Sequence, residues 1–234
     1  MIIMDRVTPV YVVVTAGGRG SRMGSALAKQ FLELGGVPIL HKTLQFFLKQ
    51  DFRKEIILVL PADYKDYWKK YCLDNSVSFS HRLVSGGITR FHSVKNALQF
   101  VPDGVKVLVH DGVRPFVTQP LLSRLLEFDM EGSGCYGVIP VLPATDSMRR
   151  KREDGSTVIV KREDYVFVQT PQLFCSSRLK EAYRQAYSPS FTDDASVFES
   201  AGYRVATVEG SRLNIKITTP EDLKMGAAID SLAI

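Results

Sequence analysis

The chain has 234 residues, of which 45% are apolar and 24% charged, a composition typical of a folded globular protein and not of a disordered one. No apolar run approaches the roughly 18 residues that cross a bilayer. The first residues also lack the layout of a signal peptide, so we expect a cytoplasmic protein with no membrane partner.

Three cysteines at wide spacing, Cys72, Cys135 and Cys175, argue against a disulfide framework and against a zinc site. The net charge of +5 suits either nucleic acid or small polyanions. The basic residues form short clusters rather than a long stripe, and others stand singly beside glycine or proline. This distribution favours phosphate groups on a small ligand, and we expect no nucleic-acid partner.

In the first part of the chain, apolar runs that end at glycine or proline alternate with apolar residues at helical spacing. This alternation predicts βαβ units with right-handed crossovers and a mainly parallel sheet. Strands are expected at residues 7–15, 55–60, 82–84, 105–109 and 136–141, and helices near residues 40–48, 63–72, 91–101 and 122–126.

The alternation of strands and helices is interrupted by a polar, charged stretch, residues 143–161, with Asp154-Gly155 near its middle. Asp-Gly between two strand-like runs is a strong hairpin signal. A hairpin that projects from an α/β domain must pack against something outside that domain, so we interpret residues 143–163 as an arm that packs on a second subunit. A disordered surface loop is the alternative.

After the arm the alternation resumes. It predicts strands at residues 166–170, 205–209 and 214–218, and helices at residues 179–186 and 195–201, with Thr192 or Asp193 as the cap of the second helix. A last helix begins at Pro220. We find no linker, so residues 1–234 are expected to form a single α/β domain. Its fold class is Rossmann-like, with a mainly parallel twisted sheet, helices on both faces and a projecting β-hairpin arm.

The first strand runs into a glycine-rich segment, Thr15-Ala-Gly-Gly-Arg-Gly-Ser-Arg-Met-Gly24, which is followed by Lys29-Gln-Phe31. Ligands of open α/β sheets bind beyond the carboxyl ends of the strands, and glycines let backbone N–H groups approach phosphates. Arg22 and Lys29 can add positive charge there. The dinucleotide and P-loop fingerprints are both broken.

Three further places carry candidate binding residues, each with a plainer alternative. Gly86-Gly87 precedes a helix with Arg90 and Ser93 and suits a base and ribose, or is a plain turn and cap. Asp111, at a strand end before Arg114, could hold a hydroxyl or form a loop-shaping ion pair. Lys216, between Ile215 and Ile217, either faces solvent or meets an anion.

Five segments in order resemble the 2-C-methyl-D-erythritol 4-phosphate cytidylyltransferase family over nearly the whole chain. They are the glycine-rich segment with Lys29-Gln-Phe31, Gly86-Gly-Ile-Thr-Arg-Phe-His-Ser-Val94, Val109-His-Asp-Gly-Val-Arg-Pro-Phe116, Gln169-Thr-Pro-Gln-Leu-Phe174, and Thr192-Asp-Asp-Ala-Ser196 followed by Asn214-Ile-Lys-Ile-Thr-Thr-Pro-Glu-Asp222. The resemblance implies an enzyme that transfers CMP from CTP to 2-C-methyl-D-erythritol 4-phosphate in the non-mevalonate isoprenoid pathway. It also implies a homodimer and a Mg²⁺ ion held mainly by the CTP phosphates.

The resemblance also implies residue roles. Arg22 and Lys29 would stabilise the transition state and the leaving pyrophosphate, while Lys216 and Arg162, the latter from the neighbouring subunit, would hold the acceptor phosphate. The nucleotide would contact Ala16, Gly17, Gly18, Gly87, Arg90, Ser93 and Asp111. The acceptor would lie near Asp111, Arg114, Ser147, Arg162, Thr192 and Lys216.

Three segments depart from the family pattern. Ala28 stands where proline is usual, Gly112-Val113 replaces two alanines, and residues 146–149 differ near the acceptor. Ribitol 5-phosphate is therefore kept as an alternative acceptor. A nucleic-acid-binding protein, a nucleotide-dependent dehydrogenase and a non-catalytic regulator fit the motifs less well.

Overall fold

The computed structural model describes residues 8–18 and 27–232, and eight of the strands in these residues form one sheet. Along the sheet the order is β10-β7-β11-β6-β1-β4-β5, and β12 also pairs with β7. β1, β4, β5, β6, β7 and β12 point in one direction, while β10 and β11 run against them. The bounds are β1 Val10–Thr15, β4 Lys54–Leu60, β5 Arg82–Ser85, β6 Lys106–Asp111, β7 Gly137–Pro143, β10 Val166–Val168, β11 Gln172–Cys175 and β12 Val205–Glu209.

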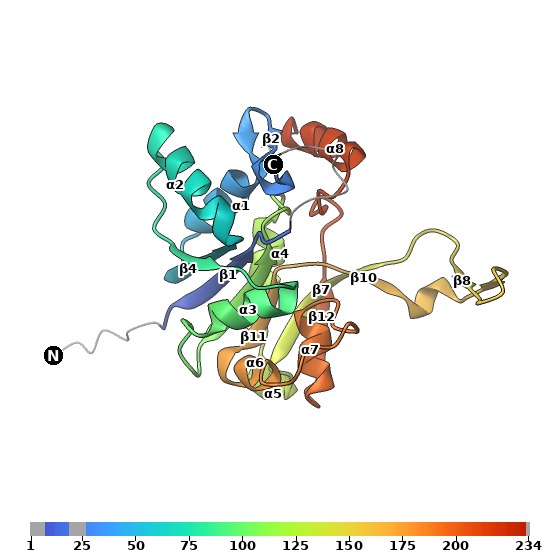
Figure 1. The fold of residues 1–234 in the computed structure, drawn as a ribbon. Helices are drawn as coiled ribbons and strands as arrows, with labels where there is room; N and C mark the ends of the chain where they lie inside the picture. The colour runs from blue at the N-terminus through green and yellow to red at the C-terminus, as the bar shows by residue number, and fades with distance from the viewer. Residues whose placement is uncertain (1–7, 19–26, 233–234) are drawn as a thin grey trace.

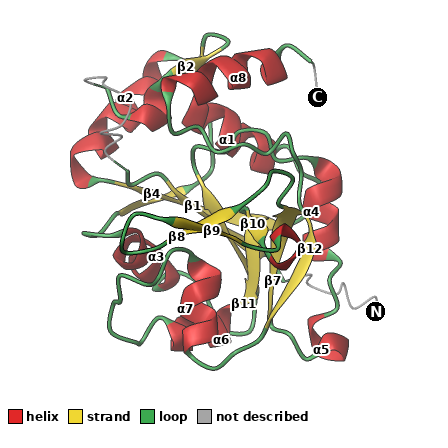
Figure 2. Cartoon of the chain, turned by 90° about the vertical axis from the view of Figure 1, so that its right-hand side faces the viewer, coloured by secondary structure: helices red, strands yellow, loops and turns green. Residues whose placement is uncertain are grey.

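Helices cover both faces of this sheet (Figures 1 and 2). On one face lie α1 (Ile39–Leu48), α2 (Lys65–Asp74) and α4 (Gln119–Leu126), and on the other α3 (Arg90–Leu98), α6 (Ser176–Ala182) and α7 (Asp194–Ser200). Successive side chains of a strand point to opposite faces. Val12 and Val14 of β1 therefore join the first apolar core and Val13 joins the second. The predicted three-layer α/β fold is confirmed.

Smaller elements complete the described chain. Residues 29–31 form a single 3-10 turn, β2 (Glu33–Leu34) pairs with β3 (Val37–Pro38), and α5 (Met130–Ser133) precedes β7. The last helix, α8 (Pro220–Asp230), begins at a Thr219 cap, and Asp193 caps α7 in the same reciprocal way. The cap predicted at Thr192 or Asp193 is thus confirmed as Asp193, and the last helix begins at Pro220 as predicted, whereas the Thr219 cap, β2, β3, β11 and α5 were not predicted.

The strand predicted at residues 214–218 is wrong, because the segment is irregular. Several of its backbone groups form hydrogen bonds with side chains and not with a neighbouring strand. The Asn214 carbonyl accepts from Arg114 and Gln169, and the Thr218 amide donates to Asp222. The Ile217 amide donates to the Val113 carbonyl, which fixes the segment beside the end of β6.

The predicted arm is an ordered hairpin that projects from the body of the protein (Figure 1). It consists of β8 (Arg149–Lys151) and β9 (Thr157–Ile159), joined by a loop in which Gly155 has a φ of 83°, where glycine is favoured. The segment therefore forms the predicted hairpin and not a loop without secondary structure.

Within residues 8–18 and 27–232, no helix is both long enough and apolar enough to cross a membrane.

Candidate active site

A cavity of about 660 Å³ lies at the carboxyl ends of four adjacent parallel strands. It begins where β1, β4, β5 and β6 end, as expected for ligand sites of open α/β sheets. We call it the larger cavity. Its walls are Thr15, Ala16, Gly17, Gly18, Lys29, Gln30, Pro61, Ala62, Asp63, Gly86, Gly87, Ile88, Thr89, Arg90, Ser93, Asp111, Val113 and Lys216.

A second cavity of about 420 Å³, the smaller cavity, lies between the end of β10, β11 and the start of α7. Its lining includes Arg114, Thr170, Gln172, Thr192 and Ser196. Three residues, Arg90, Asp111 and Lys216, line both cavities. The two cavities therefore meet at a group of charged side chains.

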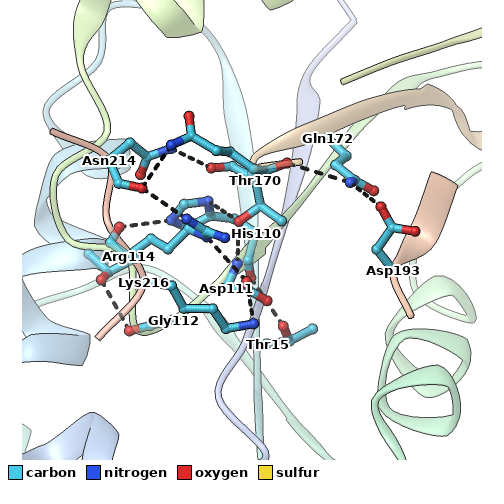
Figure 3. Close-up of polar contacts among 12 residues, drawn as sticks. Thr15, His110, Asp111, Gly112, Arg114, Thr170, Gln172, Asp193, Asn214 and Lys216 are labelled. Carbon is cyan, nitrogen blue, oxygen red and sulfur yellow. Dashed lines mark hydrogen bonds and ion pairs between the residues drawn. The ribbon is translucent and has the colours of Figure 1, made fainter. Parts of the chain in front are cut away.

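Asp111 is the centre of this group. It is the last residue of β6, and its side chain is 8% exposed. Lys216 Nζ lies 2.9 Å and Arg114 Nε 3.3 Å from its carboxylate (Figure 3). A third cation, Arg90, approaches with its Nε at 3.5 Å. Burial by itself would raise the pKa of the Asp111 carboxyl, but the charges of Arg90, Lys216 and Arg114 hold this pKa well below its usual value. Asp111 is thus ionised near neutral pH and brings three positive side chains to one point.

His110 supports this arrangement from inside the sheet. It is fully buried, and its Nε2 lies 3.0 Å from the Arg114 carbonyl, which can only accept a hydrogen bond. Nε2 therefore carries the proton and Nδ1 accepts from the Thr170 hydroxyl at 3.1 Å, while Thr170 Oγ1 accepts from the Asp111 amide at 3.0 Å. Burial lowers the pKa of His110 to about 4, so the ring is neutral at pH 7.

The loop at the end of β5 is shaped by Ser93, which is 3% exposed. Its hydroxyl accepts from the Gly87 amide at 3.1 Å and donates to the Thr89 carbonyl at 3.0 Å. A Cβ at residue 87 would lie 2.4 Å from the Cβ of His92, so this backbone approach requires glycine. The glycine pair thus brings bare backbone to the larger cavity.

Lys29 is placed by the two residues that follow it. The Gln30 side chain donates to the Ala16 carbonyl at 2.8 Å, which ties the 3-10 turn to the start of the glycine-rich segment. Phe31 is buried against the rings of Tyr64 and Tyr67, with centroids 5.4 and 4.7 Å away. These neighbours hold Lys29 at the wall of the larger cavity.

The structure brings most of the predicted site residues together. All seven predicted nucleotide-binding residues, Ala16, Gly17, Gly18, Gly87, Arg90, Ser93 and Asp111, line the larger cavity, as do Lys29 and Lys216. The smaller cavity contains four of the predicted acceptor residues, Asp111, Arg114, Thr192 and Lys216.

The remaining three predicted residues are Arg22, Ser147 and Arg162. Arg22 falls outside the described residues. Ser147 and Arg162 are exposed residues of the arm and line neither cavity, and the Arg162 guanidinium donates to the Thr145 carbonyl at 2.7 Å. Neither arm residue reaches the site of its own subunit in this structure.

The residues that were missed as individuals include Gln30, Thr170 and Gln172, which line the cavities, and Asn214, which supports their walls. Each lies in a motif that the sequence singles out, so the motif was the available signal. Gln172 donates to Asp193 and accepts from the Ala195 amide, and Asn214 is fully buried and donates to the Thr170 carbonyl. These contacts join segments distant in the chain, so their role was not visible in the sequence.

The larger cavity offers few carboxylates to a divalent cation, so such a cation would keep mostly ligand oxygens and water. Within the described chain, no three His, Cys, Asp or Glu side chains form a group that could hold a metal ion. Asp63 and Asp111 are the acids that line the larger cavity, and both oxygens of Asp111 already meet cations. Mg²⁺ binds readily through phosphates and few protein ligands.

Comparison with known proteins gives a consistent result. The family model described as 2-C-methyl-D-erythritol 4-phosphate cytidylyltransferase matches residues 10–231. Relatives of that name from Bacteroides thetaiotaomicron and Bacteroides fragilis are 49% and 48% identical over 218 residues, 93% of this chain and 98% and 97% of theirs. A solved 4-diphosphocytidyl-2C-methyl-D-erythritol synthase from Anaerococcus prevotii superposes with a TM-score of 0.79 at 28% identity, and covers 95% of this chain and 96% of its own.

Proposed function

The chain belongs to the 2-C-methyl-D-erythritol 4-phosphate cytidylyltransferase family, and we propose that its two cavities bind the two substrates of that reaction. The enzyme transfers CMP from CTP to 2-C-methyl-D-erythritol 4-phosphate and releases pyrophosphate. The observation that carries the proposal is the junction of the two cavities at Arg90, Asp111 and Lys216.

CTP is assigned to the larger cavity. Its size fits the 300–1,000 Å³ common for ligand sites. Gly17 and Gly18 at the end of β1 offer backbone to the triphosphate, and Gly87 offers backbone to the nucleoside. Lys29 supplies positive charge to the phosphates, with Arg22 as its expected partner.

The acceptor is assigned to the smaller cavity. Lys216, which is 40% exposed and lines both cavities, is positioned to pair with the acceptor phosphate. Thr192 and Ser196 offer hydroxyl groups for the polyol chain. The phosphate would thus lie next to the nucleotide, where Lys216 offsets the repulsion between the two anions.

The chemical step needs no general base, because a phosphate dianion is already deprotonated near pH 7. An acceptor phosphate oxygen attacks the α-phosphorus of CTP in line, and the bond from that phosphorus to the bridging β-phosphate oxygen breaks as pyrophosphate leaves. The protein contributes positioning and charge stabilisation. Mg²⁺, held mainly by the CTP phosphates, would supply further charge neutralisation.

The arm is assigned to a homodimer. Ile159 of β9 and Phe167 of β10 are 77% and 57% exposed, and Val166 is 51% exposed, so large apolar side chains on the arm and at its base lack a cover within their own subunit. Arg162, at the base of the arm, lines neither cavity of its own subunit. We assign it to the acceptor phosphate of the partner.

The decisive experiment measures pyrophosphate release from CTP and Mg²⁺ with 2-C-methyl-D-erythritol 4-phosphate, and with ribitol 5-phosphate as the comparison acceptor. We expect release with the first acceptor and little with the second. Release with ribitol 5-phosphate alone would contradict the acceptor, and no release from folded protein with either would contradict the activity.

A further inference from the structure

The carboxylate of Asp194 lines neither cavity but touches a residue that lines both. Asp194 is the first residue of α7 and is fully buried. Its Oδ2 accepts from Arg90 at 2.6 Å, and its Oδ1 accepts from the Tyr183 hydroxyl at 2.6 Å. Both carboxylate oxygens are therefore engaged, and Asp194 can act on a bound ligand through Arg90.

Arg90 is held between two carboxylates. One end of its guanidinium meets Asp194, and its Nε lies 3.5 Å from Asp111. Burial by itself would lower the pKa of Arg90, but the charges of Asp194 and Asp111 raise this pKa well above its usual value. The side chain is 28% exposed, so the part that Asp194 leaves uncovered faces the two cavities.

The ion pair joins the starts of two helices that serve different cavities. Arg90 is the first residue of α3, and the residues before it, Gly86 to Thr89, line the larger cavity. Asp194 is flanked by Asp193 and Ala195, which line the smaller cavity. One buried contact thus links the two walls across 104 residues of sequence.

Tyr183 of the α6 end reinforces this link. Its ring is 2% exposed and stacks on Phe91, the neighbour of Arg90, with centroids 4.8 Å apart. Its hydroxyl donates to Asp194. Tyr183 therefore contacts both helix starts, through its ring on α3 and its hydroxyl on α7.

We propose that Asp194 is a positioning residue that holds Arg90 at the boundary of the two cavities and thereby couples nucleotide binding to acceptor binding. This inference rests on the assignment of CTP to the larger cavity and of the acceptor to the smaller one. A ligand that orders the start of α3 also orders the start of α7, so the second ligand loses less conformational freedom on binding. By linkage, each ligand then tightens the other by the same factor.

The test measures this factor by calorimetry with a CTP analogue whose α,β-bridging oxygen is replaced by methylene, which cannot react. The analogue is titrated with and without saturating 2-C-methyl-D-erythritol 4-phosphate. For the unmodified protein we expect the acceptor to tighten the analogue by about fivefold or more, a typical coupling. Asp194→Asn keeps the shape of the side chain and removes its charge, and it should bring the factor to within about twofold of one.

Two matched controls isolate the position. Asp103→Asn removes a 2.6 Å ion pair with Lys180 away from both cavities, and should leave the factor unchanged. Tyr183→Phe keeps the ring and removes the hydroxyl, and it should lower the coupling factor, as Asp194→Asn does. Tyr203→Phe, which loses a hydroxyl bond to Glu181, should not.

Each outcome decides the inference. An unchanged factor in Asp194→Asn, or a factor of one in the unmodified protein, would overturn it while leaving the proposed function intact. Absence of analogue binding by the unmodified, folded protein would instead overturn the assignment of the larger cavity. If Asp194→Asn does not fold, an unchanged factor in Tyr183→Phe overturns the coupling.

Discussion

Replacing Lys216 with methionine tests the charged junction directly. The change keeps an unbranched side chain that is one atom shorter, and it removes the charge. Asp111 loses a partner at 2.9 Å but keeps Arg114 at 3.3 Å and Arg90 at 3.5 Å. Because Lys216 is 40% exposed, solvent screens its ion pair, and we expect a stability loss of about 1 kcal/mol or less.

The effect on turnover should be much larger. Lys216 is proposed to hold the nucleophilic phosphate beside CTP, and the loss of one such oriented charge costs on the order of 3–4 kcal/mol, or roughly 10²–10³ in rate. We therefore expect kcat/KM for the acceptor to fall by about this factor. The CTP analogue should still bind, because the glycine loops and Lys29 are unchanged.

The assay is pyrophosphate release, with thermal unfolding followed in parallel. Lys180→Met is the matched control, because Lys180 is 30% exposed and forms a 2.6 Å ion pair with Asp103 away from both cavities. It should retain unmodified turnover. A folded Lys216→Met protein within about threefold of the unmodified rate would refute the role assigned to Lys216.

Three further predictions follow from the geometry. Gly87→Ala should raise the KM for CTP by about tenfold or more, since the new Cβ would lie 2.4 Å from that of His92 and must displace the loop; an unchanged KM in steady-state assays would contradict this. The pKa of His110 is about 4 in the folded protein and 6.5 in the unfolded chain. Burial of the neutral ring is therefore fully compatible with folding above pH 6.5, and stability is lost as the pH falls toward 4, because the unfolded chain then binds a proton that the folded protein does not. Denaturant titrations at pH 7 and pH 5 should show about 2 kcal/mol more loss in the unmodified protein than in His110→Gln, and equal losses would exclude the buried neutral ring. The Arg162→Ala and Lys216→Met proteins should each be nearly inactive alone, yet regain activity when the two are refolded together. In a mixed dimer, one site combines the intact Lys216 of one subunit with the intact Arg162 of the other. No recovery of activity would count against the assignment of Arg162 to the site of the partner.

Much of the fold follows from local patterns in the sequence. Apolar runs that end near glycine or proline mark β1, β4 and β6, and helical spacing marks α1 and α3, because a buried strand or helix must present apolar residues at its own period. The glycine motifs also predicted where the larger cavity lies, since parallel strands end at the same edge of the sheet. The caps Asp193 and Thr219 are likewise local features.

The tertiary structure decided which residues of these elements come into contact. Residues 214–218 look like a strand in the sequence, yet Arg114 and Gln169 from distant segments donate to the Asn214 carbonyl, and the segment pairs with no strand of the described chain. Asp111 gathers cations from residues 90, 114 and 216, and Arg90 finds Asp194 a hundred residues away. The sequence around a charged residue can indicate that this residue is buried and needs a partner of opposite charge, because burying an unpaired ion is costly. Which partner it meets depends on how the crossovers bring the strand ends and helix starts together in space.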